Sequence, residues 1–190
     1  SVSNAGDVNG DGFDDVIIGA PARYGSAASY VVFGKANGFD AAIDLSGLDG
    51  NNGFRLDGEA AGDRSGFSVS NAGDVNSDGF DDLIIGAYGA DPNGFGSGSS
   101  YVVFGKASGF DAAMALSSLD GSNGFRLDGV AAFDFSGASV SNAGDVNGDG
   151  FDDVIIGARY ADRNGEHYGP SYVVFGEAAP FDAPLDLASL

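Results

Sequence analysis

The chain has 190 residues and carries 28 acidic against 8 basic side chains, which gives a formal net charge of -20 at pH 7. A surface this acidic repels phosphate groups, so nucleic acids and anionic membranes are not expected partners. The absence of cysteine excludes disulfides, thiol catalysis and cysteine-ligated zinc, and no apolar run is long enough to insert into a membrane.

Two sequence blocks each occur three times along the chain. Residues 2–20 recur unchanged at 140–158, and they recur at 69–87 with Ser77 for Gly10 and Leu83 for Val16. The block SYVVFGKA at 29–36 returns at 100–107 and, with one change, at 171–178. These matches predict three repeats, covering residues 1–64, 65–135 and 136–190. Because the chain begins at Ser1, inside a repeated block, we expect a processed product or a piece of a longer protein.

Four short antiparallel strands are predicted in each repeat, because β-branched and aromatic runs alternate with Gly, Asn and Asp. In the first repeat they cover residues 1–5, 15–20, 29–34 and 53–57, and the third repeat stops before its fourth strand. The second strand is apolar on both faces, so it should lie between neighbouring sheets. This pattern predicts an all-β protein built of β-propeller-type blades.

Ring closure is not expected from three blades, because propellers use about four to eight. The sequence therefore predicts a partial or open propeller, completed by a partner chain or by further repeats. An open stack of repeats with exposed end faces is the alternative.

The strongest chemical signal is the loop DVNGDGFDD after the first strand of each repeat, with Ser for the first Gly in the second copy. Oxygen-bearing side chains occupy positions 1, 3, 5 and 9, and a backbone carbonyl is available at position 7. Calcium takes about six to eight oxygen ligands and would offset the repulsion among these carboxylates. The sequence therefore predicts three calcium ions, one per repeat. The ligands would be Asp7, Asn9, Asp11, Phe13 and Asp15; Asp74, Asn76, Asp78, Phe80 and Asp82; and Asp145, Asn147, Asp149, Phe151 and Asp153.

Other interpretations of these loops fit less well. Magnesium prefers octahedral geometry with retained waters. EF-hand and dockerin loops need a glutamate at position 12, where this chain has Ile18, Ile85 or Ile156 inside a predicted strand. A metal-free turn rich in Asp and Asn is the remaining alternative, and three near-identical copies make it less attractive.

Two further sets of repeated side chains are assigned structural roles. At the eighth loop position we expect solvated charges, namely Asp14, Asp81 and Asp152. Packing between blades is expected of the repeated phenylalanines, namely Phe33, Phe54, Phe104, Phe125 and Phe175.

At these residues the sequence resembles the FG-GAP repeat family, the propeller repeats of integrin α-subunits and of many secreted or surface bacterial proteins. The FG corresponds to Gly66-Phe67 and is weakened to Gly137-Ala138, while the GAP corresponds to residues 19–21 and is relaxed in the later repeats. The resemblance implies a calcium-stabilised β-propeller outside the cytoplasm, secreted or on the cell surface. Seven blades are common in the family, so three blades depart from its pattern.

The loops between the second and third strands differ most among the repeats and should lie opposite the metal loops, beside residues 59–66 and 130–137. They cover residues 21–28, 88–99 and 159–170. Their aromatic and basic side chains are candidate contacts for a protein or glycan ligand, or ordinary loop residues: Arg23, Tyr24, Tyr88, Arg159, Tyr160, Arg163, His167 and Tyr168.

The function predicted from the sequence is a calcium-binding structural or adhesion module. It would self-assemble into a homo-oligomer or fibre, or form part of a longer repeat array. The first alternative is a propeller domain that recognises a glycan or protein ligand, and the second is the accessory part of a secreted enzyme. Catalysis by this chain is not expected, because its single histidine, His167, has no nucleophile elbow or matched base.

Overall fold

The computed structural model describes residues 1–25, 27–107, 109–161 and 169–190. Within these ranges the structure is all-β, as predicted, apart from three short 3-10 helices: η1 (Leu45–Gly47), η2 (Leu116–Ser118) and η3 (Leu187–Ser189). The described residues include no helix with the length and apolarity needed to cross a membrane.

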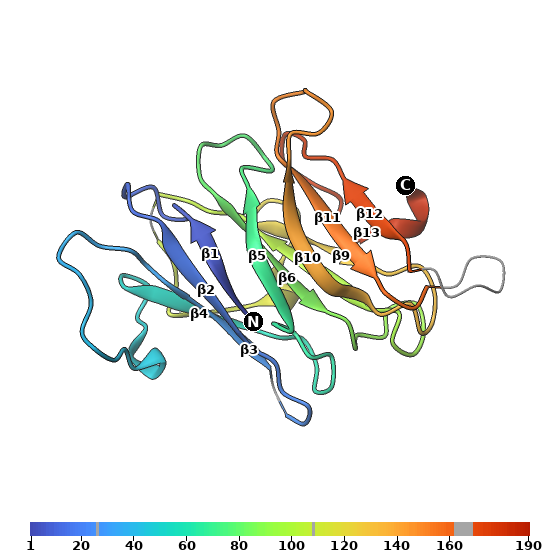
Figure 1. Ribbon diagram of the computed structural model, residues 1–190, viewed down its shortest axis with the longest axis horizontal. Helices are drawn as coiled ribbons and strands as arrows, with labels where there is room; N and C mark the ends of the chain where they lie inside the picture. The colour runs from blue at the N-terminus through green and yellow to red at the C-terminus, as the bar shows by residue number, and fades with distance from the viewer. Residues whose placement is uncertain (26, 108, 162–168) are drawn as a thin grey trace.

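Three antiparallel sheets lie side by side, one for each repeat (Figure 1). The first contains β1 (Val2–Gly6), β2 (Asp15–Ala20), β3 (Ala28–Val32) and β4 (Gly53–Asp57). The second contains β5 (Ser68–Gly73), β6 (Asp82–Ala87), β7 (Ser99–Val103) and β9 (Gly124–Asp128). The third contains β10 (Ser136–Gly144), β11 (Asp153–Ala158) and β12 (Ser171–Val174). All the predicted strands are present, with ends shifted by a few residues.

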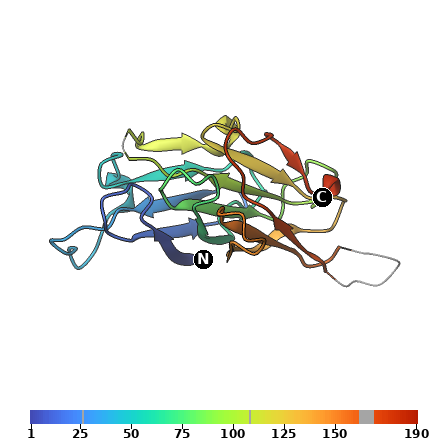
Figure 2. The same ribbon diagram turned by 90° about the horizontal axis from the view of Figure 1, so that it is seen from above.

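Two very short strands were not predicted, and each links one repeat to the sheet before it. β8 (Ala113–Ala115) follows β7 in sequence but pairs in parallel with β4 of the first sheet. β13 (Leu185–Asp186) pairs in the same way with β9 of the second sheet. Figure 2 shows these added strands on the side of the molecule opposite β1. Runs of two or three residues carry no detectable alternation, so these strands could not be predicted from the sequence.

The hydrophobic core lies between the sheets. One cluster joins Ile17, Val31 and Leu56 of the first repeat to Leu83, Ile85 and Tyr101 of the second. The other joins residues on the opposite face of the second sheet to the third sheet, and includes Ile84, Val102, Phe125, Val154 and Ile156. Consecutive residues of β6 therefore belong to different clusters, and the whole strand is buried. The prediction that this strand is covered on both faces is confirmed for β6, whereas part of β2 is exposed.

Stacked phenylalanines close the outer side of each junction. Phe110 stacks on Phe54 with ring centroids 4.6 Å apart, and Phe181 stacks on Phe125 at 4.2 Å. Four of the five phenylalanines expected to pack between blades are buried. The expectation is wrong for Phe175, which is exposed because it lies on the face of the third sheet that no described residue covers.

Candidate metal centres

Each predicted metal loop connects the first two strands of its sheet, and all three loops lie at the same end of the molecule (Figure 1). The strands enter the loop through an irregularity in register, which lies between Asn4 and Gly6 in the first repeat. There the Asn4 side chain accepts a hydrogen bond from the Gly6 N–H at 2.6 Å. The local sequence thus turns the chain sharply just before the first aspartate.

The first, third and fifth side chains of the loop fold back onto its backbone. Asp7 Oδ1 accepts from Asp11 N–H at 3.0 Å, and its Oδ2 accepts from Gly12 N–H at 2.9 Å. Asn9 Oδ1 also accepts from Asp11 N–H, at 2.9 Å, and Asp11 Oδ1 accepts from Phe13 N–H at 3.0 Å. The same bonds recur in the second and third loops. The repeated sequence therefore folds into one loop shape three times.

The ninth-position aspartates are buried and anchor each loop to its sheet. Asp15 accepts from Val8 N–H at 3.0 Å and from Gly34 N–H at 2.8 Å, and Asp82 and Asp153 make the equivalent bonds. The pKa of Asp15 is raised to about 6 and that of Asp82 to about 8, chiefly by burial; the nearby first- and fifth-position carboxylates contribute to the rise, and the hydrogen bonds from backbone N–H groups oppose it. In each of these two loops the first-, fifth- and ninth-position carboxylates are therefore close enough for electrostatic repulsion.

The chemistry of each loop suits a hard cation, because it offers three carboxylates and one amide oxygen. The carboxylate oxygens already bonded to backbone N–H groups keep further lone pairs. Within the described ranges, however, no group of three or more Asp, Glu, His or Cys side chains is arranged to hold a metal ion. A bound cation would have to share these carboxylates with the loop N–H groups, and the ligand assignment stays a prediction.

The eighth-position aspartates of the second and third repeats are not solvated charges, so that prediction is wrong for both. Asp81 Oδ2 accepts from the backbone N–H of Asp7 at 2.8 Å, and Asp152 Oδ2 accepts from that of Asp74 at 3.0 Å. In return, Asp81 and Asp152 donate their own backbone N–H groups to the Asp7 and Asp74 carbonyls. Each of these loops is thereby bonded to the metal loop of the preceding repeat. Asp14 is exposed, as expected.

The described parts of the loops between the second and third strands lie opposite the metal loops and beside residues 59–66 and 130–137, as predicted. Gly89 N–H donates to the Asp63 carbonyl at 3.0 Å, and Tyr160 N–H donates to the Asp134 carbonyl at 3.3 Å. Arg163, His167 and Tyr168 fall outside the described residues. Four further side chains at this end were not predicted as candidate contacts: Arg64, Phe95, Phe133 and Phe135. They lie outside the repeated sequence blocks, and this difference among the repeats is the sequence feature that could have identified them.

Calcium-free protein should become more stable as the pH falls from 8.5 to about 6. The folded protein binds the Asp82 proton more tightly than the unfolded chain, whose carboxyl has its ordinary pKa of 3.8. Stability is therefore gained as pH falls through about 8, with Asp15 contributing below about 6. Thermal unfolding across this range measures the effect, and Asp82→Asn should reduce the slope. A melting temperature that decreases as the pH is lowered from 8.5 to 6 would contradict the raised pKa of Asp82.

Comparison with known proteins finds the same repeats over most of the chain. Residues 1–32, 65–103 and 136–174 match the FG-GAP repeat model. Integrin alpha-4 of Xenopus laevis is 32% identical over 83% of the chain, and integrin alpha-PS5 of Drosophila melanogaster is 32% identical over 81%. Integrin alpha pat-2 of Caenorhabditis elegans is 30% identical over 90%. The chain spans 13 to 14% of the length of these relatives. With three matched segments that carry the metal loops and the strands around them, the chain belongs to the FG-GAP repeat family.

Proposed function

We propose that the chain is an extracellular, non-catalytic adhesion module in which calcium stiffens the contacts between repeats. The observation that carries the proposal is the bonding between successive loops. The Asp7 backbone bonds to Asp81 in both directions, and the carbonyl of Val8 accepts from Lys106 N–H at 3.0 Å. The junction between the second and third repeats has the same bonds, made by Asp74, Asp152, Val75 and Glu177.

Calcium in one loop would therefore act on the neighbouring repeat. A cation held by the first, third, fifth and ninth side chains would fix the backbone of the first two loop residues, to which the next repeat is bonded. It would also offset the repulsion among the loop carboxylates in a chain of net charge -20. Integrin alpha relatives support the adhesion part of the proposal.

Removing calcium should lower the melting temperature by about 10 °C. Extracellular modules bind calcium at about 10⁻⁴ to 10⁻³ M, so a tenfold excess over Kd stabilises each site by about 1.4 kcal/mol, and three sites by about 4 kcal/mol. A domain of this size shifts by about 2 to 4 °C per kcal/mol. Calorimetry with millimolar calcium, and again after chelation, measures the difference.

Two variants separate the loops from general charge effects. Asp78→Ala removes one predicted ligand and should abolish about a third of the calcium-induced shift, because one site of three is lost. Asp111→Ala removes an equal charge at an exposed position outside the three loops and should leave the shift unchanged. An identical melting curve with and without chelator would sink the calcium part of the proposal.

Association with further repeats of the same sequence is the second part of the proposal. The third repeat packs on the second through Val140, Val154, Ile156, Tyr172 and Val174, and the first repeat has identical residues at the corresponding positions of its outer face, where Val32 is already buried. On that face Val2 and Val16 are exposed, and on the uncovered face of the third repeat Val146, Val173 and Phe175 are exposed.

The uncovered face of the third repeat likewise carries the residues that the second repeat uses in the same junction. They are Ala143, Val146, Ile155, Val173 and Phe175, matching Ala72, Val75, Ile84, Val102 and Phe104. A second copy could therefore repeat this internal junction head to tail. Light scattering on the calorimetry samples tests this: a mass that grows with concentration supports association, and a monomer at every concentration overturns it.

A further inference from the structure

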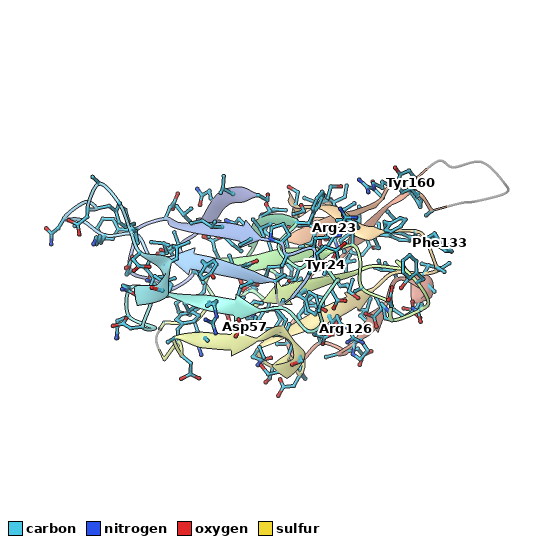
Figure 3. All side chains as sticks on the ribbon, turned by 90° about the horizontal axis from the view of Figure 1, so that it is seen from below. Arg23, Tyr24, Asp57, Arg126, Phe133 and Tyr160 are labelled. Carbon is cyan, nitrogen blue, oxygen red and sulfur yellow. The ribbon has the colours of Figure 1, made fainter. Side chains whose placement is uncertain are left out.

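Arginine and aromatic side chains gather at the end of the molecule opposite the metal loops. Arg64, Tyr88, Phe135, Arg159 and Tyr160 form what we call the arginine–aromatic cluster, which spans all three repeats. Figure 3 views this end directly, with Arg23, Tyr24, Phe133 and Tyr160 labelled on it. A hollow of about 500 Å³ lies beside the cluster and is lined by Arg64, Tyr88, Phe135 and Arg159, among others.

The two arginines of the cluster are held by aromatic rings. The guanidinium carbon of Arg64 lies 5.0 Å from the Tyr88 ring centroid, and that of Arg159 lies 5.2 Å from the same centroid. Arg159 also lies 4.9 Å from the centroid of Tyr160. Stacking of this kind fixes a guanidinium while leaving the N–H groups at its edge free to donate.

Carboxylate partners are missing at these arginines among the residues that the structure describes. Arg64 and Arg159 form no ion pair and donate no side-chain hydrogen bond to any described residue, whereas Arg55 and Arg126 are both paired with carboxylates. The chain carries 28 acidic residues, so carboxylates are not scarce.

The nearby carboxylates are engaged by the backbone. Asp63 accepts from Ala60 N–H at 3.1 Å, and Asp91 accepts from Gly96 N–H at 2.5 Å. Both residues line the hollow without forming an ion pair with either arginine. Two guanidinium groups beside one ring repel each other, and an anion bonded to them would offset that repulsion.

The arrangement of the rings favours protein side chains over sugar rings. Phe67 meets Tyr88 edge to face at an interplanar angle of 76°, Tyr88 meets Phe135 at 63°, and Phe135 meets Tyr160 at 76°. Rings set at steep angles do not form the flat platform on which a pyranose stacks. Tyrosine and arginine around a partly enclosed hollow are instead typical of the residues that dominate protein interfaces.

We propose that the arginine–aromatic cluster binds an acidic segment of a partner protein, whose carboxylates would bond to Arg64 and Arg159. Apolar side chains of the segment would pack on the exposed rings of Phe67, Phe95 and Phe133. This inference rests on the proposed adhesion function and names the class of ligand for it.

A binding assay with a defined probe tests the inference. The probe is a short fluorescein-labelled peptide with glutamates flanking a phenylalanine, and its counterpart has glutamine at each glutamate. Fluorescence anisotropy in millimolar calcium should show the acidic peptide binding about tenfold or more tighter than the amide peptide. Arg64→Gln and Arg159→Gln should each weaken binding about tenfold.

Arg55→Gln is the matched control. Arg55 is paired with Asp57, so this variant should leave peptide binding unchanged. The inference is overturned if neither peptide binds, if both bind equally, or if Arg55→Gln weakens binding as much as the cluster variants. Tighter binding of an oligogalacturonate than of the peptide, with the same arginine dependence, would overturn the choice of a protein ligand.

Failure of this inference is distinguishable from failure of the proposed function. The melting temperature of the same samples, measured without peptide, reports the response to calcium. If binding depends on the arginines but the melting temperature does not respond to calcium, this inference stands and the calcium proposal is refuted. A calcium response without peptide binding would do the reverse.

Discussion

Replacing Gly73 with alanine should destabilise the protein far more than the same replacement at Gly144. Each glycine directly precedes the first aspartate of its metal loop, within the shared sequence SNAGDVN. Both have positive φ, +74° at Gly73 and +68° at Gly144. A methyl group at Gly73 would overlap the Asp152 carboxylate and the Asn142 amide of the next repeat, whereas at Gly144 it would meet nothing within 4 Å. Both variants pay the backbone penalty, but only one disturbs a junction.

The expected difference is large enough to measure by urea unfolding. Positive φ costs an alanine about 1 to 2 kcal/mol, which should be the whole loss at Gly144. Overlap at Gly73 adds about 1 to 3 kcal/mol, and loss of the Asp152 hydrogen bond to Asp74 adds about 1 kcal/mol. Equal losses for the two variants would show that the loop-to-loop contact does not contribute to stability.

Phe181→Ala should cost about 3 to 5 kcal/mol, whereas Phe39→Ala should cost less than about 1 kcal/mol. The two residues occupy corresponding positions in the third and first repeats. Phe181 is 5% exposed and stacks on Phe125 of the second repeat, whereas Phe39 is 51% exposed. Truncation therefore removes a buried contact between repeats in one case and a surface side chain in the other.

Unfolding in denaturant, with calcium present throughout, compares these two variants. The slope of the transition should stay close to that of the parent chain, because the surface exposed on unfolding hardly changes. A loss at Phe39 as large as that at Phe181 would mean that this phenylalanine stabilises its own repeat, independently of any neighbour.

The strands could be predicted because the sequence repeats. Val16, Ile17 and Ile18 recur in kind in each copy, and their apolar succession indicated burial on both faces. The structure shows that burial depends on neighbours as well as on sequence. Phe104 and Phe175 occupy equivalent positions, yet only Phe104 has a repeat packed over it. Which copy is covered is not encoded in the residue itself.

The metal loops and the arginine–aromatic cluster, at opposite ends of the molecule, could be predicted from the sequence to different degrees. Spacing alone identified the loops, but the role of Asp81 and Asp152 depends on how close the next loop lies, which no local pattern reports. The arginine–aromatic cluster joins Arg64, Tyr88 and Arg159 from three repeats across large distances in the sequence. Only the packing of the sheets brings those side chains together.

The pairing of β8 with β4 gives the chain a direction of growth. The first sheet acquires its outermost strand only when residues 113–115 of the second repeat pair with β4. In the same way, the second sheet is completed only when residues 185–186 pair with β9. During synthesis from the N-terminus, the newest sheet is thus always unfinished, and each arriving repeat completes the one before it. Folding of an array built this way would advance one repeat behind the ribosome, with unpaired edges confined to its most recent member.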